Sequence, residues 1–242
     1  MWIVLGDVNG DGDLDIVVAN ASAQGNRVYI NDINDDGGIG VFTDSGQSLG
    51  TNDSQSIMLG NVDGVNGLDI VVANGGTQPN QVYLNNGSGS FANGQSLGSN
   101  DSQSIVLGDV NGDGDLDIVV ANASGEGNQV YINDINNDGS VGVFTDSGQS
   151  LGTNDSQSIV LGDVDGDADL DMLLANTGVS NQNRVYTNDG AGNFTDSGQS
   201  LGANDSQSVI LGDVDGDADL DAVVGNGGAQ GDRVYLGSLS GT

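Results

Sequence analysis

The sequence has no cysteine, no histidine and no lysine, and it contains a single glutamate and a single proline. Disulfides, zinc–thiolate centres and catalysis by cysteine or histidine are therefore excluded. Three arginines stand against 34 aspartates, and the formal net charge is -32. A chain this acidic cannot neutralise the phosphates of a nucleic acid or bind an anionic membrane surface, because both need clustered Lys and Arg.

Long apolar segments are also missing. The longest apolar runs have about five residues, which is too short to cross a bilayer. No basic segment followed by an apolar stretch opens the chain, so we expect no signal peptide within it. What is abundant is glycine, with 42 of 242 residues. Short apolar runs such as 3–5 and 16–18 recur between Gly, Asn and Asp residues, which is typical of many short strands joined by tight turns.

Internal repetition organises the whole chain. A segment of the type LGDVNGDGDLD begins at Leu5, Leu59, Leu107, Leu161 and Leu211. These starts predict five copies of a unit of about 50 residues within one domain, 1–242. We number the copies as repeats 1 to 5, and they span residues 1–50, 51–98, 99–152, 153–202 and 203–242.

Each repeat carries four strand signals and no helical periodicity. Four short strands per repeat are typical of a β-propeller blade, so we predict an all-β, five-bladed β-propeller of four-stranded blades. A parallel β-helix is the alternative, but its repeat has about nine residues. We expect the aromatic residues at fixed repeat positions to pack between blades; they are Tyr29, Tyr83, Tyr131, Tyr186, Tyr235, Phe42, Phe91, Phe144 and Phe194.

The last repeat is incomplete. No Phe-Thr-Asp-Ser-Gly-Gln-Ser segment follows Leu236. We therefore predict that the last blade lacks its outer strand and that residues 232–236 present an unpaired edge. We expect a monomer whose ring is closed by packing between blades. The alternative is that the open edge recruits another chain.

The segment between the first and second strand of each repeat is rich in aspartate. In repeat 1, acidic or amide residues at alternate positions are separated by Val8, Gly10, Gly12 and Leu14. Alternate side chains in a tight loop can converge, and carboxylate and amide oxygens form the hard oxygen cage that Ca²⁺ prefers. Positions one, three, five and nine would provide side chains, position seven a backbone carbonyl, and Leu14 an apolar contact with the blade.

Four loops have the full pattern, so we predict about four calcium ions per chain. The predicted metal ligands are Asp7, Asn9, Asp11, Asp13 and Asp15; Asp109, Asn111, Asp113, Asp115 and Asp117; Asp163, Asp165, Asp167, Asp169 and Asp171; and Asp213, Asp215, Asp217, Asp219 and Asp221.

The other Asp-rich stretches are less complete. In the loop from Asn61 to Asp69, Val65 replaces the fifth ligand, so we predict an empty or weak site. Ala168 and Ala218 occupy the turn position that Gly12 occupies in repeat 1, which implies strain if φ is positive. Two similar stretches lack the closing carboxylate, and we expect them to be Asp/Asn turns with weak calcium binding as the alternative; they comprise Asp32, Asn34 and Asp36, and Asp134, Asn136 and Asp138.

These loops resemble a known family. The pattern D-x-[DN]-x-D-G-x-L-D after an Ile-Val-Leu-Gly strand is similar to the FG-GAP/VCBS repeats, a family that includes the α-integrin propeller. The resemblance implies a propeller with calcium in the loop between the two inner strands of each blade. It also implies extracellular binding, adhesion or scaffold roles. Integrin propellers have seven blades, whereas this chain has five copies.

The sequence therefore favours a secreted or surface-displayed, calcium-stabilised binding, adhesion or structural module with a protein or glycan ligand. A calcium-dependent lectin is the alternative, although little aromatic surface is free for sugars. We expect no enzyme activity, because His, Lys and Cys are absent and the close Asp pairs are assigned to ion loops. We expect no nucleic-acid partner and no insertion into a membrane.

Overall fold

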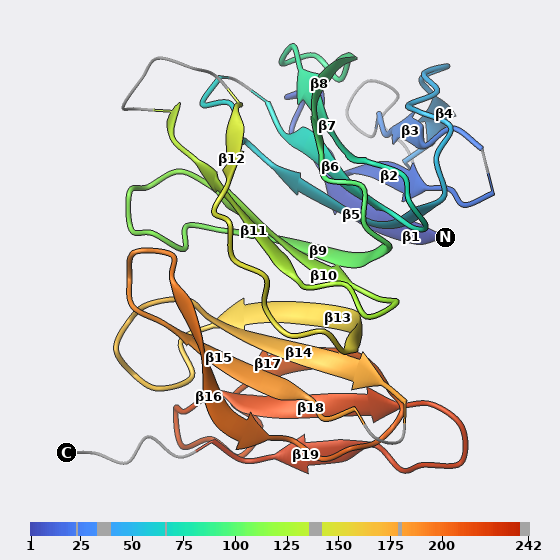
Figure 1. The fold of residues 1–242 in the computed structure, drawn as a ribbon. Helices are drawn as coiled ribbons and strands as arrows, with labels where there is room; N and C mark the ends of the chain where they lie inside the picture. Colours follow the sequence, from blue (N-terminus) through green and yellow to red (C-terminus); the bar gives the residue numbers. More distant parts are fainter. Residues whose placement is uncertain (23, 33–39, 66, 136–141, 179–180, 238–242) are drawn as a thin grey trace. The chain divides into compact units, whose positions relative to one another are not determined.

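The computed structural model describes residues 1–22, 24–32, 40–65, 67–135, 142–178 and 181–237. Its architecture is all-β, and Figure 1 follows the strands from the blue N-terminal to the red C-terminal end. The chain divides into two compact units, which are described separately. One comprises Met1–Leu107 and Asn133–Thr145, and the other Gly108–Ile132 and Asp146–Thr242.

The first unit contains two complete four-stranded antiparallel sheets, with strands paired in sequence order. The first sheet consists of β1 (Trp2–Gly6), β2 (Asp15–Ala19), β3 (Arg27–Ile30) and β4 (Thr43–Asp44). The second consists of β5 (Ser54–Gly60), β6 (Asp69–Asn74), β7 (Asn80–Asn85) and β8 (Phe91–Leu97).

The second unit contains one complete four-stranded sheet and one three-stranded sheet, again paired in sequence order. The first consists of β13 (Asp155–Gly162), β14 (Asp171–Thr177), β15 (Arg184–Asn188) and β16 (Phe194–Ser200). The second consists of β17 (Ser206–Gly212), β18 (Asp221–Asn226) and β19 (Arg233–Tyr235).

The sheet of repeat 3 has the order β12-β11-β10-β9, and the division between the two units passes through it. Its strands are β9 (Ser102–Gly108), β10 (Asp117–Asn122), β11 (Gln129–Asn133) and β12 (Phe144–Asp146). The predicted four-stranded blade-like sheets are thus present, and the last sheet ends at its third strand within the described residues. The predicted repeat bounds and single domain stay predictions.

The second strand of each repeat is the most buried. Every residue of β6 and of β10 is buried, from the opening aspartate to the closing asparagine. A strand that is covered on both faces has a continuous run of apolar residues, whereas a strand with one exposed face alternates apolar and polar residues. This explains why Ile-Val-Val-Ala recurs at this position, whereas the first strands mix buried and half-buried residues.

The hydrophobic core of the first unit is shared between repeats 1 and 2. Val8, Val17 and Val28 of repeat 1 form one cluster with residues of repeat 2, among them Ile57 and Tyr83. The predicted packing role of the aromatic residues is confirmed here, because Tyr83 is buried in this cluster and Phe91 packs against it. Phe42 of repeat 1 is the exception, with 46% of its surface exposed.

A glycine at the end of the first strand receives two leucines of the following repeat. A Cβ atom added to Gly162 would lie 2.7 Å from Leu211 Cδ1 and 2.9 Å from Leu220 Cδ1. Gly6 and Gly108 show the same two approaches, at 2.7 to 2.9 Å, from the leucines of repeats 2 and 4. Only glycine leaves room for these side chains, so the Leu-Gly-Asp motif is a packing motif between repeats as well as the start of a loop.

This contact corrects the expectation for Leu14, which was predicted to attach its loop to its own blade. The corresponding leucines Leu68, Leu170 and Leu220 instead approach the glycine of the preceding repeat. In repeat 1, the corresponding Leu14 is 56% exposed.

We expect Gly162→Ala to destabilise the protein by about 1–3 kcal/mol, because the added methyl group overpacks the contact with Leu211 and Leu220. Gly212→Ala is the matched control, since nothing lies within 4 Å of a Cβ atom at that position. Urea unfolding monitored by circular dichroism gives both values. Equal stability of the two variants would contradict the packing role of Gly162.

Candidate metal centres

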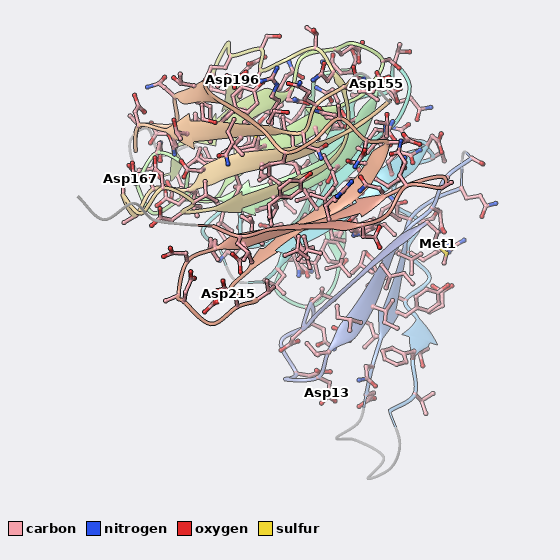
Figure 2. All side chains as sticks on the ribbon, turned by 90° about the horizontal axis from the view of Figure 1, so that it is seen from below. Met1, Asp13, Asp155, Asp167, Asp196 and Asp215 are labelled. Atoms are coloured by element: carbon pink, nitrogen blue, oxygen red, sulfur yellow. The ribbon has the colours of Figure 1, made fainter. Side chains whose placement is uncertain are left out.

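The five Asp-rich segments are the loops of the hairpins formed by the first and second strands of the repeats. In repeat 4, Gly162 pairs with Asp171 at the base of this hairpin, and the residues between them form the loop. Gly6 with Asp15 and Gly212 with Asp221 are the same pairs in repeats 1 and 5. Figure 2 labels Asp13, Asp167 and Asp215, each of which lies in such a loop.

The aspartate at position one shapes the loop through backbone hydrogen bonds. Asp7 accepts hydrogen bonds from Gly10 N at 2.7 Å and from Gly12 N at 2.9 Å. The loops of repeats 3, 4 and 5 repeat both bonds, with distances of 2.6–2.7 Å for the first and 2.9–3.1 Å for the second. These bonds fold the chain around one carboxylate, so the loop geometry is determined largely by local contacts.

The aspartate at position nine is buried and closes the loop. Asp171 Oδ2 accepts a hydrogen bond from Val164 N at 3.0 Å, and its Oδ1 accepts one from Asn188 N at 2.9 Å. Asp15 and Asp69 have the same two kinds of donor at 2.8–2.9 Å. This carboxylate therefore connects the start of the loop to the end of the third strand.

Burial raises the pKa of Asp15, Asp69 and Asp171 above the ordinary aspartate value of 3.8, although the two backbone N–H donors oppose the shift. Neighbouring loop carboxylates add to the rise, as Asp11 does for Asp15 and Asp165 for Asp171. A buried carboxylate among other carboxylates lacks a counter-charge, and a bound cation would supply it.

Positions one, three and nine converge in two loops. One carboxylate oxygen each from Asp163, Asp165 and Asp171 lies within 4.8 Å of the other two. Asp213, Asp215 and Asp221 form an equivalent cluster in repeat 5. These groups contain three of the five ligands predicted for each loop, and a set of carboxylate oxygens is the donor set that calcium binds. Both clusters therefore fit a hard divalent cation.

The remaining predicted ligands have other contacts in the described residues. At position five, Asp11, Asp113, Asp167 and Asp217 each accept a hydrogen bond from the backbone N–H of position seven, at 2.8–3.0 Å. At position three of repeats 1 and 3, the amide nitrogens of Asn9 and Asn111 donate to the position-five carboxylate at 2.7 and 2.8 Å. The structure does not gather positions five and seven into the clusters of repeats 4 and 5.

The loop of repeat 2 differs as the sequence predicts. Its closing residue Asp69 is buried and keeps both backbone donors. At position five, however, Val65 is 52% exposed and offers no oxygen from its side chain. The loop thus preserves the hydrogen bonds of its closing aspartate but lacks a ligand group where the other loops have aspartate.

Two loops contain strained backbone. Ala168 and Ala218 have φ values of 76° and 78°, where Gly12 and Gly114 have 93°. The condition stated for strain at these alanines, a positive φ, is therefore met. An alanine in this region costs about 1–2 kcal/mol. The two other Asp-rich stretches, from Asp32 and Asp134 onward, fall largely outside the described residues, which include neither Asn34 and Asp36 nor Asn136 and Asp138.

The asparagine that ends the third strand is a structural residue that the sequence reasoning missed. Asn188 N donates to Asp171, while Asn188 Nδ2 donates to Val110 O of the preceding loop at 2.7 Å. Asn85 makes the same bond to Val8 O, at 2.7 Å. The signal was available in the recurring Val-Tyr-x-Asn, which becomes Val-Tyr-Leu-Gly in repeat 5.

The sequence matches the FG-GAP-like repeat over residues 61–120, 109–174 and 163–224, and the FG-GAP repeat over residues 1–31. The chain belongs to the FG-GAP repeat family. The predicted resemblance is thereby confirmed. The matched segments all include or border the Asp-rich loops described above.

Solved structures with similar folds have low sequence identity to this FG-GAP repeat protein. An Agrocybe aegerita lectin that recognises non-reducing terminal N-acetylglucosamine is 20% identical, with a TM-score of 0.52 over 92% of this chain and 60% of that chain. A structure of BBS1N in complex with ARL6DN is 11% identical, with a TM-score of 0.51 over 96% and 78% of the two chains. An auxiliary nutrient binding protein from Bacteroides thetaiotaomicron is 10% identical, with a TM-score of 0.51 over 92% and 56%.

This chain therefore spans 60% of the length of the lectin and about as much of the nutrient binding protein. The search of curated proteins found no match. Within the described residues, no helix has the length and apolar character needed to cross a membrane.

The raised pKa values predict that the free energy of unfolding changes with pH in opposite directions with and without calcium. Between 3.8 and the raised pKa, the carboxyl groups of Asp15, Asp69 and Asp171 bind more protons in the folded state than in the unfolded chain. Asp221 in repeat 5 acts in the opposite direction, because the backbone donors Val214 N and Gly237 N lower its pKa, so the expected rise comes from repeats 1, 2 and 4. The free energy of unfolding of the calcium-free protein should therefore rise as the pH falls from 7 through this window. With calcium it should fall, because protons compete with the ion for the carboxylates.

Thermal melts between pH 7 and pH 4.5, in calcium-free and calcium-containing buffer, measure this difference. High salt in both buffers screens the general repulsion of the acidic chain. Parallel pH curves in the two buffers would show that the ion does not bind these carboxylates.

Proposed function

We propose that the chain is a calcium-stabilised β-propeller of five blades that acts as an extracellular binding or structural module. The observation that carries this proposal is the convergence of Asp163, Asp165 and Asp171, repeated by Asp213, Asp215 and Asp221. The proposed protein is a monomer that binds a protein or a glycan.

Repulsion between the carboxylates of each cluster favours the binding of a cation. Two unit charges about 4 Å apart repel each other by roughly 4 kcal/mol at an effective dielectric constant of about 20. Each cluster brings three carboxylates together, and one of them is buried. Calcium suits such a site better than magnesium, because magnesium keeps several of its waters and demands octahedral geometry.

The four loops with the full ligand pattern are the proposed calcium sites, and the loop of repeat 2 is a weak site or none. The loops of repeats 1 and 3 share the position-one and position-nine hydrogen bonds of the clustered loops. The four loops share these backbone hydrogen bonds and have oxygen-bearing side chains at the same positions. This similarity supports calcium binding in all four.

An extracellular role agrees with this chemistry, since weak calcium sites are filled at the millimolar calcium of extracellular fluids. We propose no catalysis, because the chain has no histidine, lysine or cysteine to act as acid, base or nucleophile. A repeated sugar pocket would need an exposed aromatic side chain in each repeat. The strongly exposed aromatic residues of the described chain, Trp2 and Phe42, both belong to repeat 1.

Calorimetric titration with calcium should give about four sites per chain. Asp165→Ala should remove one of them, because it deletes a cluster ligand at an exposed position without removing a buried hydrogen bond. Asp196→Ala is the matched control, since it deletes an exposed carboxylate outside the loops. Fewer than three sites in the unaltered protein, or equal stoichiometry in both variants, would contradict the assignment.

Removal of calcium should lower the melting temperature strongly. A site held at about one hundred times its Kd contributes ~2.7 kcal/mol, so four sites together contribute ~11 kcal/mol. That sum is comparable to the whole stability of many domains. Differential scanning calorimetry in calcium and in EDTA at low salt measures the effect. A melting temperature that is indifferent to EDTA would identify the loops as ordinary turns.

A further inference from the structure

The four complete Asp-rich loops fall into two types. The loops of repeats 1 and 3 both read Asp-Val-Asn-Gly-Asp-Gly-Asp-Leu-Asp, and the loops of repeats 4 and 5 both read Asp-Val-Asp-Gly-Asp-Ala-Asp-Leu-Asp. We call them the Asn-type and the Asp-type loops. They differ at position three, which is asparagine or aspartate, and at position six, which is glycine or alanine. An Asn-type loop therefore has four carboxylates, and an Asp-type loop has five.

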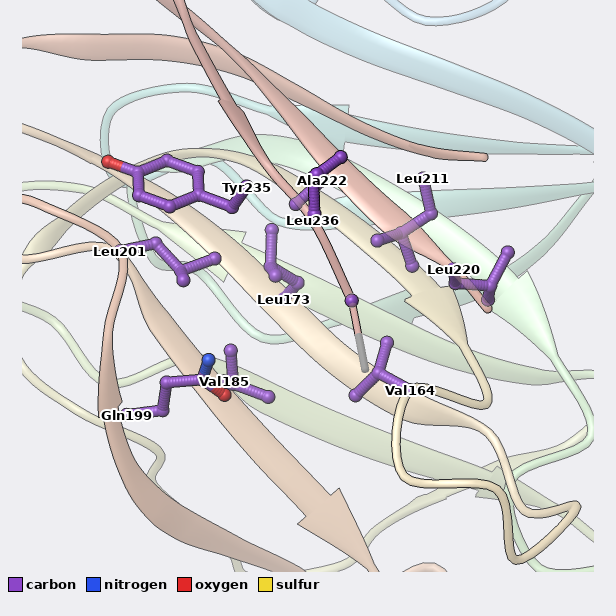
Figure 3. Close-up of a pocket in the computed structure, with 11 residues that line it drawn as sticks. Val164, Leu173, Val185, Gln199, Leu201, Leu211, Leu220, Ala222, Tyr235 and Leu236 are labelled. Carbon is purple, nitrogen blue, oxygen red and sulfur yellow. The ribbon is translucent and has the colours of Figure 1, made fainter. Parts of the chain in front are cut away.

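The surroundings of these two positions are alike in both types. In all four loops the position-one aspartate accepts hydrogen bonds from the backbone of positions four and six, at 2.6–3.1 Å. At position two, Val8 and Val110 are buried, and Val164 packs against the core cluster shared by repeats 4 and 5. Figure 3 shows Val164 with Leu211 and Tyr235 in the lining of one pocket. The difference between the types is therefore local.

In the Asn-type loops, the position-three amide is bound on both sides by position five. Asn9 Nδ2 donates a hydrogen bond to Asp11 Oδ2 at 2.7 Å, and Asn9 Oδ1 accepts one from Asp11 N at 3.2 Å. Asn111 and Asp113 form the same two bonds, at 2.8 and 3.1 Å. Hydrogen bonds to a charged group are stronger than those between neutral groups. The position-five carboxylate is therefore stabilised within the loop, before any ion binds.

In the Asp-type loops, a carboxylate takes the place of this amide. Asp167 N donates to Asp165 Oδ1 at 3.3 Å, and Asp217 N donates to Asp215 Oδ1 at 3.2 Å, so position three keeps its bond to the backbone of position five. A carboxylate, however, has no proton to donate to the neighbouring carboxylate. Desolvation and the charge of Asp167 both raise the pKa of Asp165. Like charges are thus adjacent where the Asn-type loops have a hydrogen bond.

The position-three carboxylate of the Asp-type loops also belongs to the cluster proposed to hold the ion. An oxygen of Asp165 lies within 4.8 Å of oxygens of Asp163 and Asp171. A cation bound there offsets a repulsion that is present in the ion-free loop. In an Asn-type loop, an ion that takes the position-five carboxylate has to compete with the hydrogen bond from Asn9 or Asn111. Both effects favour tighter binding by the Asp-type loops.

We propose that position three divides the four proposed calcium sites into two affinity classes. The Asp-type loops of repeats 4 and 5 bind calcium about tenfold or more tightly than the Asn-type loops of repeats 1 and 3, because ligand charge and site rigidity set calcium affinity. This inference rests on the calcium binding proposed above. It makes stabilisation by calcium stepwise, since repeats 4 and 5 are stabilised at low calcium and repeats 1 and 3 only at higher calcium.

Reciprocal substitutions at position three test the assignment. Calorimetric titration of the full, calcium-free chain with calcium should show two tight sites followed by two weaker ones. Asn111→Asp should give three tight sites and one weaker site, and Asp165→Asn should give one tight site and three weaker sites. Neither variant alters position six, where Gly114 and Ala168 stay in place. Two tight and two weaker sites in both variants would overturn the proposal, because the classes would then follow position six or the surrounding repeat.

Two matched controls separate the effect of position three from the effect of net charge. Asn93→Asp adds one negative charge, and Asp196→Asn removes one, each at an exposed position outside the loops. Both variants should keep two tight and two weaker sites. If either control changes these numbers as the loop variants do, the affinity depends on the charge of the whole chain, and the proposal is wrong.

Thermal melts give a second readout that does not depend on fitting binding curves. In EDTA, Asn111→Asp should lower the melting temperature, because it replaces the amide donor to Asp113 with a repelling charge. In millimolar calcium this loss should become smaller or reverse, because the tighter ion binding compensates for it. An equal loss in the two buffers would mean that the calcium affinity is unchanged, which would contradict the role of position three.

The titration of the unaltered protein distinguishes the failure of this inference from the failure of the proposed function. Four sites of equal affinity would overturn the two classes and leave calcium binding by the loops in place. The absence of calcium binding would overturn both. Cooperative melting of each variant in calcium shows that a changed number of tight sites reflects the loop and not a loss of folding.

Discussion

The constraint on which the structure depends is that no repeat can bury its apolar faces alone. Strands such as β6 and β10 are covered on both faces, yet each sheet has only four short strands. The second cover comes from the adjacent repeat, as Ile70 and Val72 of β6 form one cluster with Val8 and Val17 of repeat 1. The free energy of unfolding is then approximately the sum of a contribution from each repeat and a contribution from each contact between neighbouring repeats, as in other repeat proteins.

The same junctions carry the Asp-rich loops, so the backbone of these loops is coupled to the packing between repeats. Asp171 holds the start of its loop and the end of β15, and Asn188 connects β15 to the preceding loop at Val110. A cation bound in one loop, as proposed, would therefore steady the backbone that contacts the next repeat. This arrangement gives the buried aspartate a structural role even in repeat 2, where Asp69 keeps its hydrogen bonds although Val65 replaces a ligand.

Burial at equivalent positions differs between repeats 1 and 5 and the repeats between them. In repeat 1, Leu14 and Phe42 are exposed where their equivalents pack on the preceding repeat. In repeat 5, nothing lies near a Cβ atom at Gly212, and the pocket beside Tyr235 remains open. Identical local sequence thus has different burial according to its position in the array.

Much of this could be predicted from the sequence, because its signals are local. The four Leu-Gly-Asp copies with their Leu-Gly-Asn variant in repeat 2, the left-handed turn position of Ala168 and the altered loop at Val65 follow from repeat spacing and turn chemistry. The tertiary structure decided what depends on contacts between residues far apart in the sequence. It placed Leu14 in solvent, gave the asparagine after Val-Tyr-x its bond to the preceding loop, and brought positions one, three and nine together in the loops of repeats 4 and 5. These outcomes depend on which repeat stands next to which, and no single repeat contains that information.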